Sequence, residues 1–193
     1  MILYLSIIFV AMLFIALFNC LFNSLGHSIL FISLLVVLVT LAQILIDVLL
    51  ATVFRWCIPK RFVSLEKKWF GATKREARFY ERIGIKKWKD KTLELGRFTG
   101  FSKSKLGDVN DIKYLERFIV EANYGVLVHL ACIIIGFSIV FICPVPYRLK
   151  IGLPVWSINL LLNGMSTFIL RYNLPKLHVL YKFNKKRQLN KVS

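Results

Sequence analysis

Residues 28–54 have the sequence SILFISLLVVLVTLAQILIDVLLATVF, in which Asp47 is the one charged side chain. A helix rises about 1.5 Å per residue and the hydrocarbon core of a bilayer is roughly 30 Å thick, so about 20 apolar residues suffice to cross it. The run is followed by Arg-Trp at 55–56 and Pro-Lys-Arg at 59–61, residues that anchor a helix at the inner face of a membrane. The stretch predicts a transmembrane helix.

Three more apolar runs accompany it, at residues 1–22, 119–145 and 151–170. Hydrophobic residues make up 57% of the chain, whereas a soluble domain is roughly 45–50% apolar. The first run has neither the basic start nor the small-residue cleavage site of a signal peptide. We therefore expect an all-α, polytopic membrane protein with four transmembrane helices, forming a single membrane domain over residues 1–193. The third run is expected to end at Pro144-Val145-Pro146, because proline interrupts a helix, and the fourth is expected to stop at RYNLP (171–175).

The basic residues predict how these helices are oriented. Of the 27 lysines and arginines, 18 lie in the loop at residues 55–118 and seven in the tail at 171–193, whereas two, Arg148 and Lys150, lie between the third and fourth runs. Positive charge accumulates on the cytoplasmic side of multi-pass proteins. We therefore expect a multi-pass protein of the cell membrane, with both termini and the loop in the cytoplasm.

The loop mixes aromatic residues with lysine and arginine at LEKKWF (65–70) and FYERIGIKKW (79–88), a pattern typical of an amphipathic helix in the headgroup plane. We expect it to contact anionic membrane lipid. The net charge of +17 is then a topology signal, and nucleic acid is not expected as a partner. The four cysteines have no CxxC spacing, so neither a disulfide framework nor a metal site is predicted. No bound cofactor is expected.

Asp47, Glu121 and His129 are the ionisable side chains inside the apolar runs. A charged group at the centre of a membrane helix costs about 2.5–3.5 kcal/mol on insertion scales, which makes each of the three a functional candidate. Counted inward from Arg55 and Arg117, Asp47 lies roughly 12 Å deep and His129 roughly 18 Å deep. Glu121 lies near the interface by the same count.

Polar residues spaced four apart share one face of a helix. Three such stripes occur, formed by Gln43 and Asp47, by Glu121, Gly125 and His129, and by Asn159, Asn163, Thr167 and Arg171. If neighbouring helices run antiparallel, His129 lies at about the same depth as Asn159 of the fourth run and Gln43 of the second. Because amides and carboxylates are not left to lipid, the stripes should face one another in an inner-leaflet polar pocket. Taken singly, each amide could equally be a contact that only joins two helices.

A set of short motifs follows in order along residues 60–180: Glu76 through Tyr80-Glu81, IKKWKD (85–90), FIVE (118–121) with His129 eight residues on, Asn163, and RYNLPKL (171–177). In order and spacing they resemble the glycosyl-4,4'-diaponeurosporenoate acyltransferase family of carotenoid-glycolipid synthesis. The resemblance implies an enzyme that attaches a fatty acyl chain to the sugar of a glycosylated carotenoid.

Carried over residue by residue, the resemblance assigns site roles to Trp88, Lys89, Glu121, His129, Asn163, Arg171, Tyr172 and Asn173. Next to this Trp-Lys pair, Asp90 is a carboxylate among basic residues, expected to form an ion pair or to orient a ligand. The chain departs from the family pattern at three positions, where a carboxylate, a glutamine and an arginine are replaced by Val126, Leu170 and Leu174. Either activity on the family's usual substrate is lost or Asp47 takes the place of the missing carboxylate.

The preferred hypothesis is an acyltransferase that moves a fatty acyl group onto a hydroxyl of a membrane-embedded glycolipid or isoprenoid-linked sugar. His129 would remove the hydroxyl proton, with Glu121 or Asp47 orienting its ring. Asn159 and Asn163 would hydrogen-bond the sugar or the developing oxyanion.

The acyl donor, acyl-CoA or an acyl carrier, would be a co-substrate whose anionic groups bind Arg171 and the lysines Lys86, Lys87 and Lys89. Two other classes stay open. A non-catalytic lipid-binding or assembly subunit would use the polar stripes only to pack its helices. A small membrane methyltransferase or reductase would also need few helices, but the loop contains no glycine-rich phosphate cradle.

Overall fold

The computed structural model describes residues 2–22, 26–65, 67–89 and 110–192, and over these ranges the chain is helical, without strands. The predicted all-α class is thus confirmed for the described residues. The chain divides into two compact units, with boundaries inside α5 (Ile112–Gly136) and α7 (Leu153–Val192). We call Ile2–Arg55 with Val128–Met165 the apolar unit, and Trp56–Leu127 with Ser166–Ser193 the basic unit.

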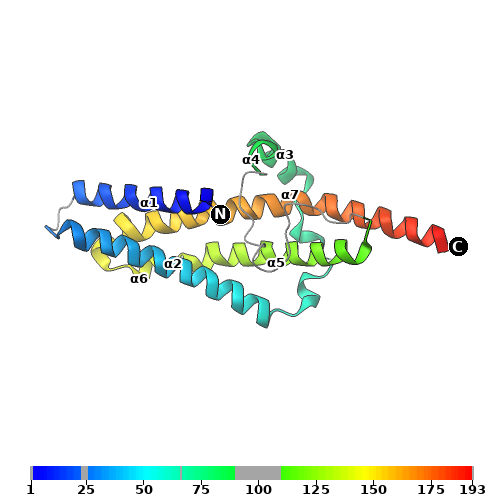
Figure 1. Ribbon diagram of the computed structural model, residues 1–193, viewed down its shortest axis with the longest axis horizontal. Helices are drawn as coiled ribbons and strands as arrows, with labels where there is room; N and C mark the ends of the chain where they lie inside the picture. Colours follow the sequence, from blue (N-terminus) through cyan, green and yellow to red (C-terminus); the bar gives the residue numbers. More distant parts are fainter. Residues whose placement is uncertain (1, 23–25, 66, 90–109, 193) are drawn as a thin grey trace. The chain divides into compact units, whose positions relative to one another are not determined.

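The apolar unit is a packed set of helices, shown in Figure 1, to which α1 (Ile2–Leu21), most of α2 (Ile29–Cys57) and α6 (Ile139–Ile142) belong. Its core packs Ile15 of α1 against Val36 of α2, together with Ile139 of α6 and Val155 of α7. Proline lacks the backbone N–H that a helix needs, and after Pro144 and Pro146 the chain continues as a short 3₁₀ segment, η5 (Val145–Tyr147), and a short π-helical segment, η6 (Arg148–Gly152).

Large apolar side chains cover the outer faces of these helices: Leu30 is 78% exposed and Ile134 is 72% exposed. Extended apolar surface is rare on soluble proteins and marks contact with a membrane or a partner. Within the described residues, three helical stretches are long and apolar enough to cross a membrane, Ile29–Cys57, Ile112–Ile142 and Val145–Asn190. Leu5–Leu21 is apolar but shorter, so a transmembrane helix at residues 1–22 stays a prediction.

The run at 119–145 is divided into α5 and α6. The Asp111 carboxylate accepts the backbone N–H of Lys113 at 2.9 Å, which caps the start of α5. The helix ends at Gly136, and a turn at residues 137–138 precedes α6.

The predicted end of the fourth helix at residues 171–175 is wrong, since α7 continues through Pro175 to Val192. Proline lacks the N–H that would bond the carbonyl of Arg171 four residues earlier. That carbonyl instead accepts the backbone N–H of Ala72 at 2.8 Å. The Pro175 ring lies against Gly71, where an added Cβ would be 3.2 Å from the proline Cγ. A neighbouring segment thus supplies the missing hydrogen bond.

The basic unit is built around α3 (Lys74–Arg82) and α4 (Ile85–Trp88), which follow the short turns η1 (Lys60–Val63) and η2 (Lys68–Phe70). Thr73 and Glu76 form a reciprocal capping box that starts α3. Gly84 joins α3 to α4 with a φ of 71°, a conformation that suits glycine.

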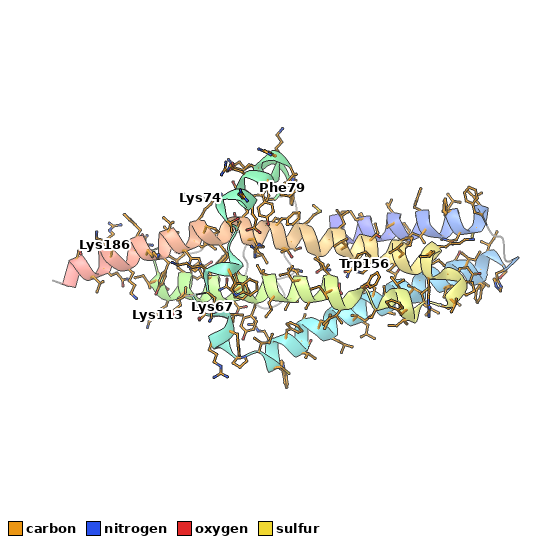
Figure 2. The ribbon with its side chains drawn as sticks, turned by 180° about the vertical axis from the view of Figure 1, so that it is seen from behind. Lys67, Lys74, Phe79, Lys113, Trp156 and Lys186 are labelled. Carbon is orange, nitrogen blue, oxygen red and sulfur yellow. The ribbon has the colours of Figure 1, made fainter. Side chains whose placement is uncertain are left out.

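The two helices pack onto α7 through aromatic residues. Tyr80, Ile85 and Tyr172 form a buried cluster with Phe168 packed against it. Figure 2 shows Phe79 pointing toward α7, where its ring meets that of Phe168 edge-on with centroids 6.4 Å apart.

Candidate functional site

Asn163 of α7 is the centre of a polar network inside the apolar unit. Its Nδ2 donates to Oδ1 of Asn159 at 2.6 Å, to the Asn159 carbonyl at 3.2 Å and to Oδ2 of Asp47 at 3.2 Å. Its Oδ1 lies 2.7 Å from Nδ1 of His129. The network therefore joins a carboxylate of α2 and an imidazole of α5 through an amide of α7, as polar groups in an apolar environment require.

These contacts determine which ring nitrogen of His129 carries a proton. The Asp47 carboxylate and the side-chain oxygen of Asn159 are acceptors, so the NH₂ group of Asn163 faces them and its oxygen faces the ring. Nδ1 of His129 is then the donor, and in the neutral ring the lone pair is on Nε2. The side chain is partly exposed. This tautomer can act as a general base through Nε2.

Asp47 is held by a second amide on its own helix. Nε2 of Gln43, one turn earlier on α2, donates to Oδ1 of Asp47 at 3.1 Å. The Sγ of Cys132 lies 3.9 Å from the backbone carbonyl of Asp47. Each carboxylate oxygen thus receives an amide N–H, Oδ1 from Gln43 and Oδ2 from Asn163, which fixes its orientation.

Gly136 at the end of α5 permits the close approach of these helices. A Cβ at this position would lie 2.8 Å from Nδ2 of Asn159 and 2.8 Å from Nε2 of Gln43. The same Nδ2 of Asn159 donates to the carbonyl of Cys132 at 3.1 Å. Sequence reasoning missed Gly136, although a glycine inside an apolar run signals close backbone packing.

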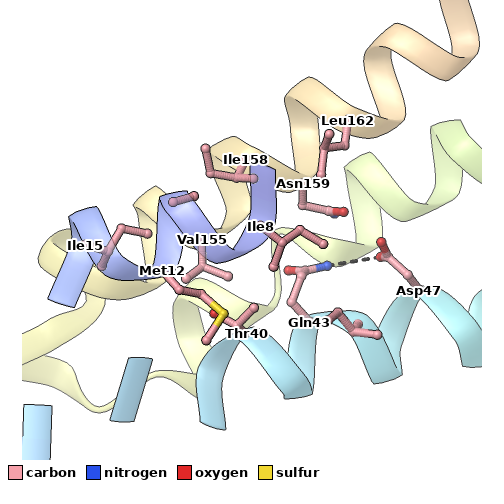
Figure 3. Close-up of a pocket in the computed structure, with 12 residues that line it drawn as sticks. Ile8, Met12, Ile15, Thr40, Gln43, Asp47, Val155, Ile158, Asn159 and Leu162 are labelled. Atoms are coloured by element: carbon pink, nitrogen blue, oxygen red, sulfur yellow. Dashed lines mark hydrogen bonds between the residues drawn. The ribbon is translucent and has the colours of Figure 1, made fainter. Parts of the chain in front are cut away.

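A narrow crevice adjoins the network, as Figure 3 shows. It has a volume of about 40 Å³ and is walled by apolar side chains of α1, α2 and α7. Its polar lining residues are Thr40, Gln43, Asp47 and Asn159. The crevice therefore combines an apolar channel with the polar groups of the network.

Arg171 forms a second cluster, within the basic unit. Its guanidinium donates to both carboxylate oxygens of Glu76, at 2.8 and 3.0 Å, and to the carbonyls of Trp69 at 2.9 Å and Gly71 at 3.4 Å. The Arg171 side chain is 15% exposed and that of Glu76 is 35% exposed. The guanidinium therefore holds the start of α3 against α7, and an incoming anion would have to compete with Glu76.

The pKa of Glu76 lies below its ordinary value of 4.5. Burial alone would raise this pKa, but the backbone N–H of Thr73 and the positive charge of Arg171 together outweigh burial. Glu76 is therefore ionised at neutral pH, as both its capping contact and its ion pair require.

Tyr172 belongs to a third group of contacts, also in the basic unit. Its hydroxyl donates to Oε1 of Glu81 at 3.0 Å, and Nζ of Lys86 lies 2.9 Å from the same oxygen. The hydrogen bonds from Lys86 and Tyr172 lower the pKa of Glu81, and Glu81 in turn raises the pKa of Lys86. Lys176 places its Nζ 3.8 Å from the centre of the Tyr172 ring, a cation–π contact.

The remaining predicted site residues are distributed over the basic unit. The indole N–H of Trp88 donates to the carbonyl of Ile83 at 3.2 Å, and Lys89 follows at the end of α4, partly buried. Glu121 lies on the part of α5 that belongs to this unit, and Asn173 lies on α7; both are partly buried. Asp90 is outside the described residues. No group of three or more His, Cys, Asp or Glu able to hold a metal ion occurs among the residues that the structure places.

The fold and the polar network place this chain in a class of helical proteins. Proteins of this class have helices able to cross a membrane and a network that links a carboxylate, an amide and an imidazole. Over residues 66–182, more than half of its length, the sequence matches the glycosyl-4,4'-diaponeurosporenoate acyltransferase family. The chain belongs to this family, as its motifs predicted. No match was found among curated proteins or solved structures.

Proposed function

We propose that this protein is an integral membrane acyltransferase, which moves a fatty acyl group from a thioester donor onto a hydroxyl of a membrane-embedded glycolipid or isoprenoid-linked sugar. Membership of an acyltransferase family supports the reaction class. The observation that supports the site is the chain of contacts from Asp47 through Asn163 to Nδ1 of His129. These contacts leave the lone pair of the neutral ring on Nε2, the nitrogen that would take the proton of a hydroxyl.

In the proposed reaction, Nε2 of His129 takes the proton of the acceptor hydroxyl while its oxygen attacks the acyl carbonyl. A carbon–oxygen bond forms, the carbon–sulfur bond to the donor breaks, and the proton passes from Nε2 to the departing sulfur. The ring is neutral again after each cycle. Asn163 and Asp47 act as positioning residues, because they hold the imidazole and stabilise its cation without exchanging groups with the substrate.

The basic unit is proposed to receive the donor, acyl-CoA or an acyl carrier. Arg171 already binds Glu76, so we assign it to holding α3 in place. Lys87, exposed near the end of α4, is proposed to attract the anionic groups of the donor and of membrane lipid. We further propose four transmembrane helices in the cell membrane, with α1 as the first and both termini in the cytoplasm.

The experiment is an acyl-transfer assay with the purified full-length chain in lipid nanodiscs, using a labelled long-chain acyl-CoA and extracted membrane lipid as acceptor. His129→Ala should lower the rate about 10²–10⁴-fold, the usual range for loss of a general base. The matched control is His27→Ala, an exposed histidine in the same unit, which should leave the rate unchanged. Full activity of His129→Ala with an unchanged unfolding temperature would refute the proposed mechanism.

A second candidate is a non-catalytic lipid-binding subunit. Val126, at the position of the family's second carboxylate, is fully buried in the basic unit, so an apolar side chain has replaced an ionisable one in the interior. In that case wild-type and His129→Ala proteins would retain the same bound lipid and neither would transfer an acyl group.

A further inference from the structure

The crevice beside the polar network has the largely apolar lining that an alkyl chain requires. Ala11 and Met12 of α1 lie on one side of it and Val155 of α7 on another. Figure 3 shows Ile15 and Asp47 toward opposite ends of the crevice. Thr40 and Asp47, which both line it, are seven residues apart on α2, so it extends roughly 10 Å along that helix. Its volume of about 40 Å³ is too small for a sugar ring.

Gln43 gives an independent indication that the crevice takes a ligand. Its side chain is 4% exposed, and its Oε1 accepts no hydrogen bond from any group that the structure describes. Figure 3 shows this oxygen on the side of the amide away from Asp47. A buried acceptor without a donor is unfavourable, so an occupant with an O–H or N–H group in its head would satisfy it.

We propose that the crevice binds the alkyl chain of the fatty acyl donor, with the chain end toward Ile15 and the thioester head at the end formed by Gln43 and Asp47, where the amide N–H nearest the donor's sulfur donates to Oε1 of Gln43. This assignment rests on the proposed function, and it makes the crevice the determinant of chain length. Apolar walls favour a methylene chain over water, which would find few hydrogen-bond partners along them. The polar end lies in the same network as His129, where the acyl carbonyl has to react.

The test changes the size of the crevice without touching the network. Ala11→Leu fills the crevice and should shift the preferred donor toward shorter chains, by about fourfold in relative kcat/KM for each methylene that no longer fits. Met12→Ala enlarges it and should shift the preference toward longer chains. Leu13→Ala is the matched control, because Leu13 is 55% exposed on the outer face of α1.

Two readouts separate this inference from the proposed function. The first is transfer measured in nanodiscs with donors of different chain lengths, and the second is mass spectrometry of the acyl chains that co-purify with each variant. Opposite shifts in Ala11→Leu and Met12→Ala, with Leu13→Ala unchanged, support the crevice in either readout. If the wild type transfers acyl groups but all variants have the same preference for chain length, the inference about the crevice is overturned and the proposed function is not. If the wild type transfers no acyl group, the proposed function is overturned. The lengths of the acyl chains that co-purify with each variant then show whether the crevice binds an alkyl chain.

Discussion

Arg171 is fixed by the residues around it more firmly than an exposed arginine. It pairs with both oxygens of Glu76 and with two backbone carbonyls of the segment before α3. Its Nη2 contacts both carboxylate oxygens while its Nη1 donates to the carbonyl of Trp69, and the single ammonium group of a lysine cannot serve both directions. Arg171 is therefore placed to hold α3 on α7, while its predicted role in binding a donor stays a prediction.

This ion pair gives the basic unit a defined pH dependence. Because the pKa of Glu76 is lowered on folding, its contribution to stability is present above pH 4.5 and is lost as the pH falls through the folded-state pKa. Glu76→Gln should lower the free energy of unfolding by about 1 kcal/mol at pH 7, after allowance for solvent screening. The difference from wild type should be smaller at pH 4 than at pH 7.

Thermal unfolding in detergent at both pH values checks this expectation. Glu116→Gln, which changes an exposed glutamate of α5, is the control. An equal loss of stability at both pH values would mean that Glu76 acts through its shape rather than its charge.

Counting residues inward from the membrane boundary predicted which side chains form the polar network, but not which of them contact one another. His129 was expected opposite Asn159, yet it contacts Asn163, one helical turn further along α7. The count took Arg117 and Arg171 as markers of equal depth, and an error of one turn, about 5.4 Å, is within what such markers allow. The pairing of Glu76 with Arg171 spans 95 residues and has no local pattern, although the capping box at 73–76 could be recognised in the sequence.

At the scale of elements, α7 shows why a local rule failed. Proline ends most helices because the carbonyl four residues earlier loses its partner. In α7, the backbone N–H of Ala72 serves that carbonyl, and the proline ring packs on Gly71. This compensation comes from a segment about 100 residues away in the sequence, so inspection of residues 171–175 alone could not predict it.

Gly136 leads to a prediction for the helices of the apolar unit. Gly136→Ala places a Cβ 2.8 Å from two amide nitrogens that are both hydrogen-bonded, one to Asp47 and one to Cys132. At least one of these bonds must lengthen, so we expect a loss of about 1–3 kcal/mol in the free energy of unfolding. Thermal unfolding in detergent measures it.

The matched control is Gly164→Ala on α7. A Cβ at Gly164 has no atom within 4 Å, and alanine favours a helix by about 1 kcal/mol, so this variant should be neutral or more stable. If both alanine variants behaved alike, the close approach of α5 to Gln43 and Asn159 would be disproved.

For the whole molecule, the distribution of charge predicts how the chain crosses the membrane. Only Arg148 and Lys150 lie in the connection between the third and fourth apolar runs, and the remaining 25 of the 27 basic residues lie in the loop and the tail. In a cysteine-free background, Leu149→Cys should react with a membrane-impermeant maleimide added to intact cells. Lys186→Cys should react only after the cells are permeabilised.

Phe14→Cys, on the exposed apolar face of α1, should stay unlabelled in both conditions and serves as the control. Labelling of position 186 but not of position 149 in intact cells would reverse the proposed orientation.

The helical class followed from the sequence because long uncharged runs leave few alternatives in a membrane. The division into two compact units did not, because it depends on which residues make contact rather than on any local pattern. The narrow crevice was equally inaccessible to sequence reasoning, since its apolar lining residues look the same in sequence as those that face lipid.

The amide of Asn163 has a consequence for how protons move. A carboxylate bonded directly to an imidazole can share its proton, but a neutral amide between them has no site that takes up or releases one at ordinary pH. Asp47 can therefore orient His129 electrostatically while remaining isolated from it as an acid. Any proton that reaches Nε2 has to leave by the same nitrogen, so this network would handle one proton at a time and return it on the side from which it came.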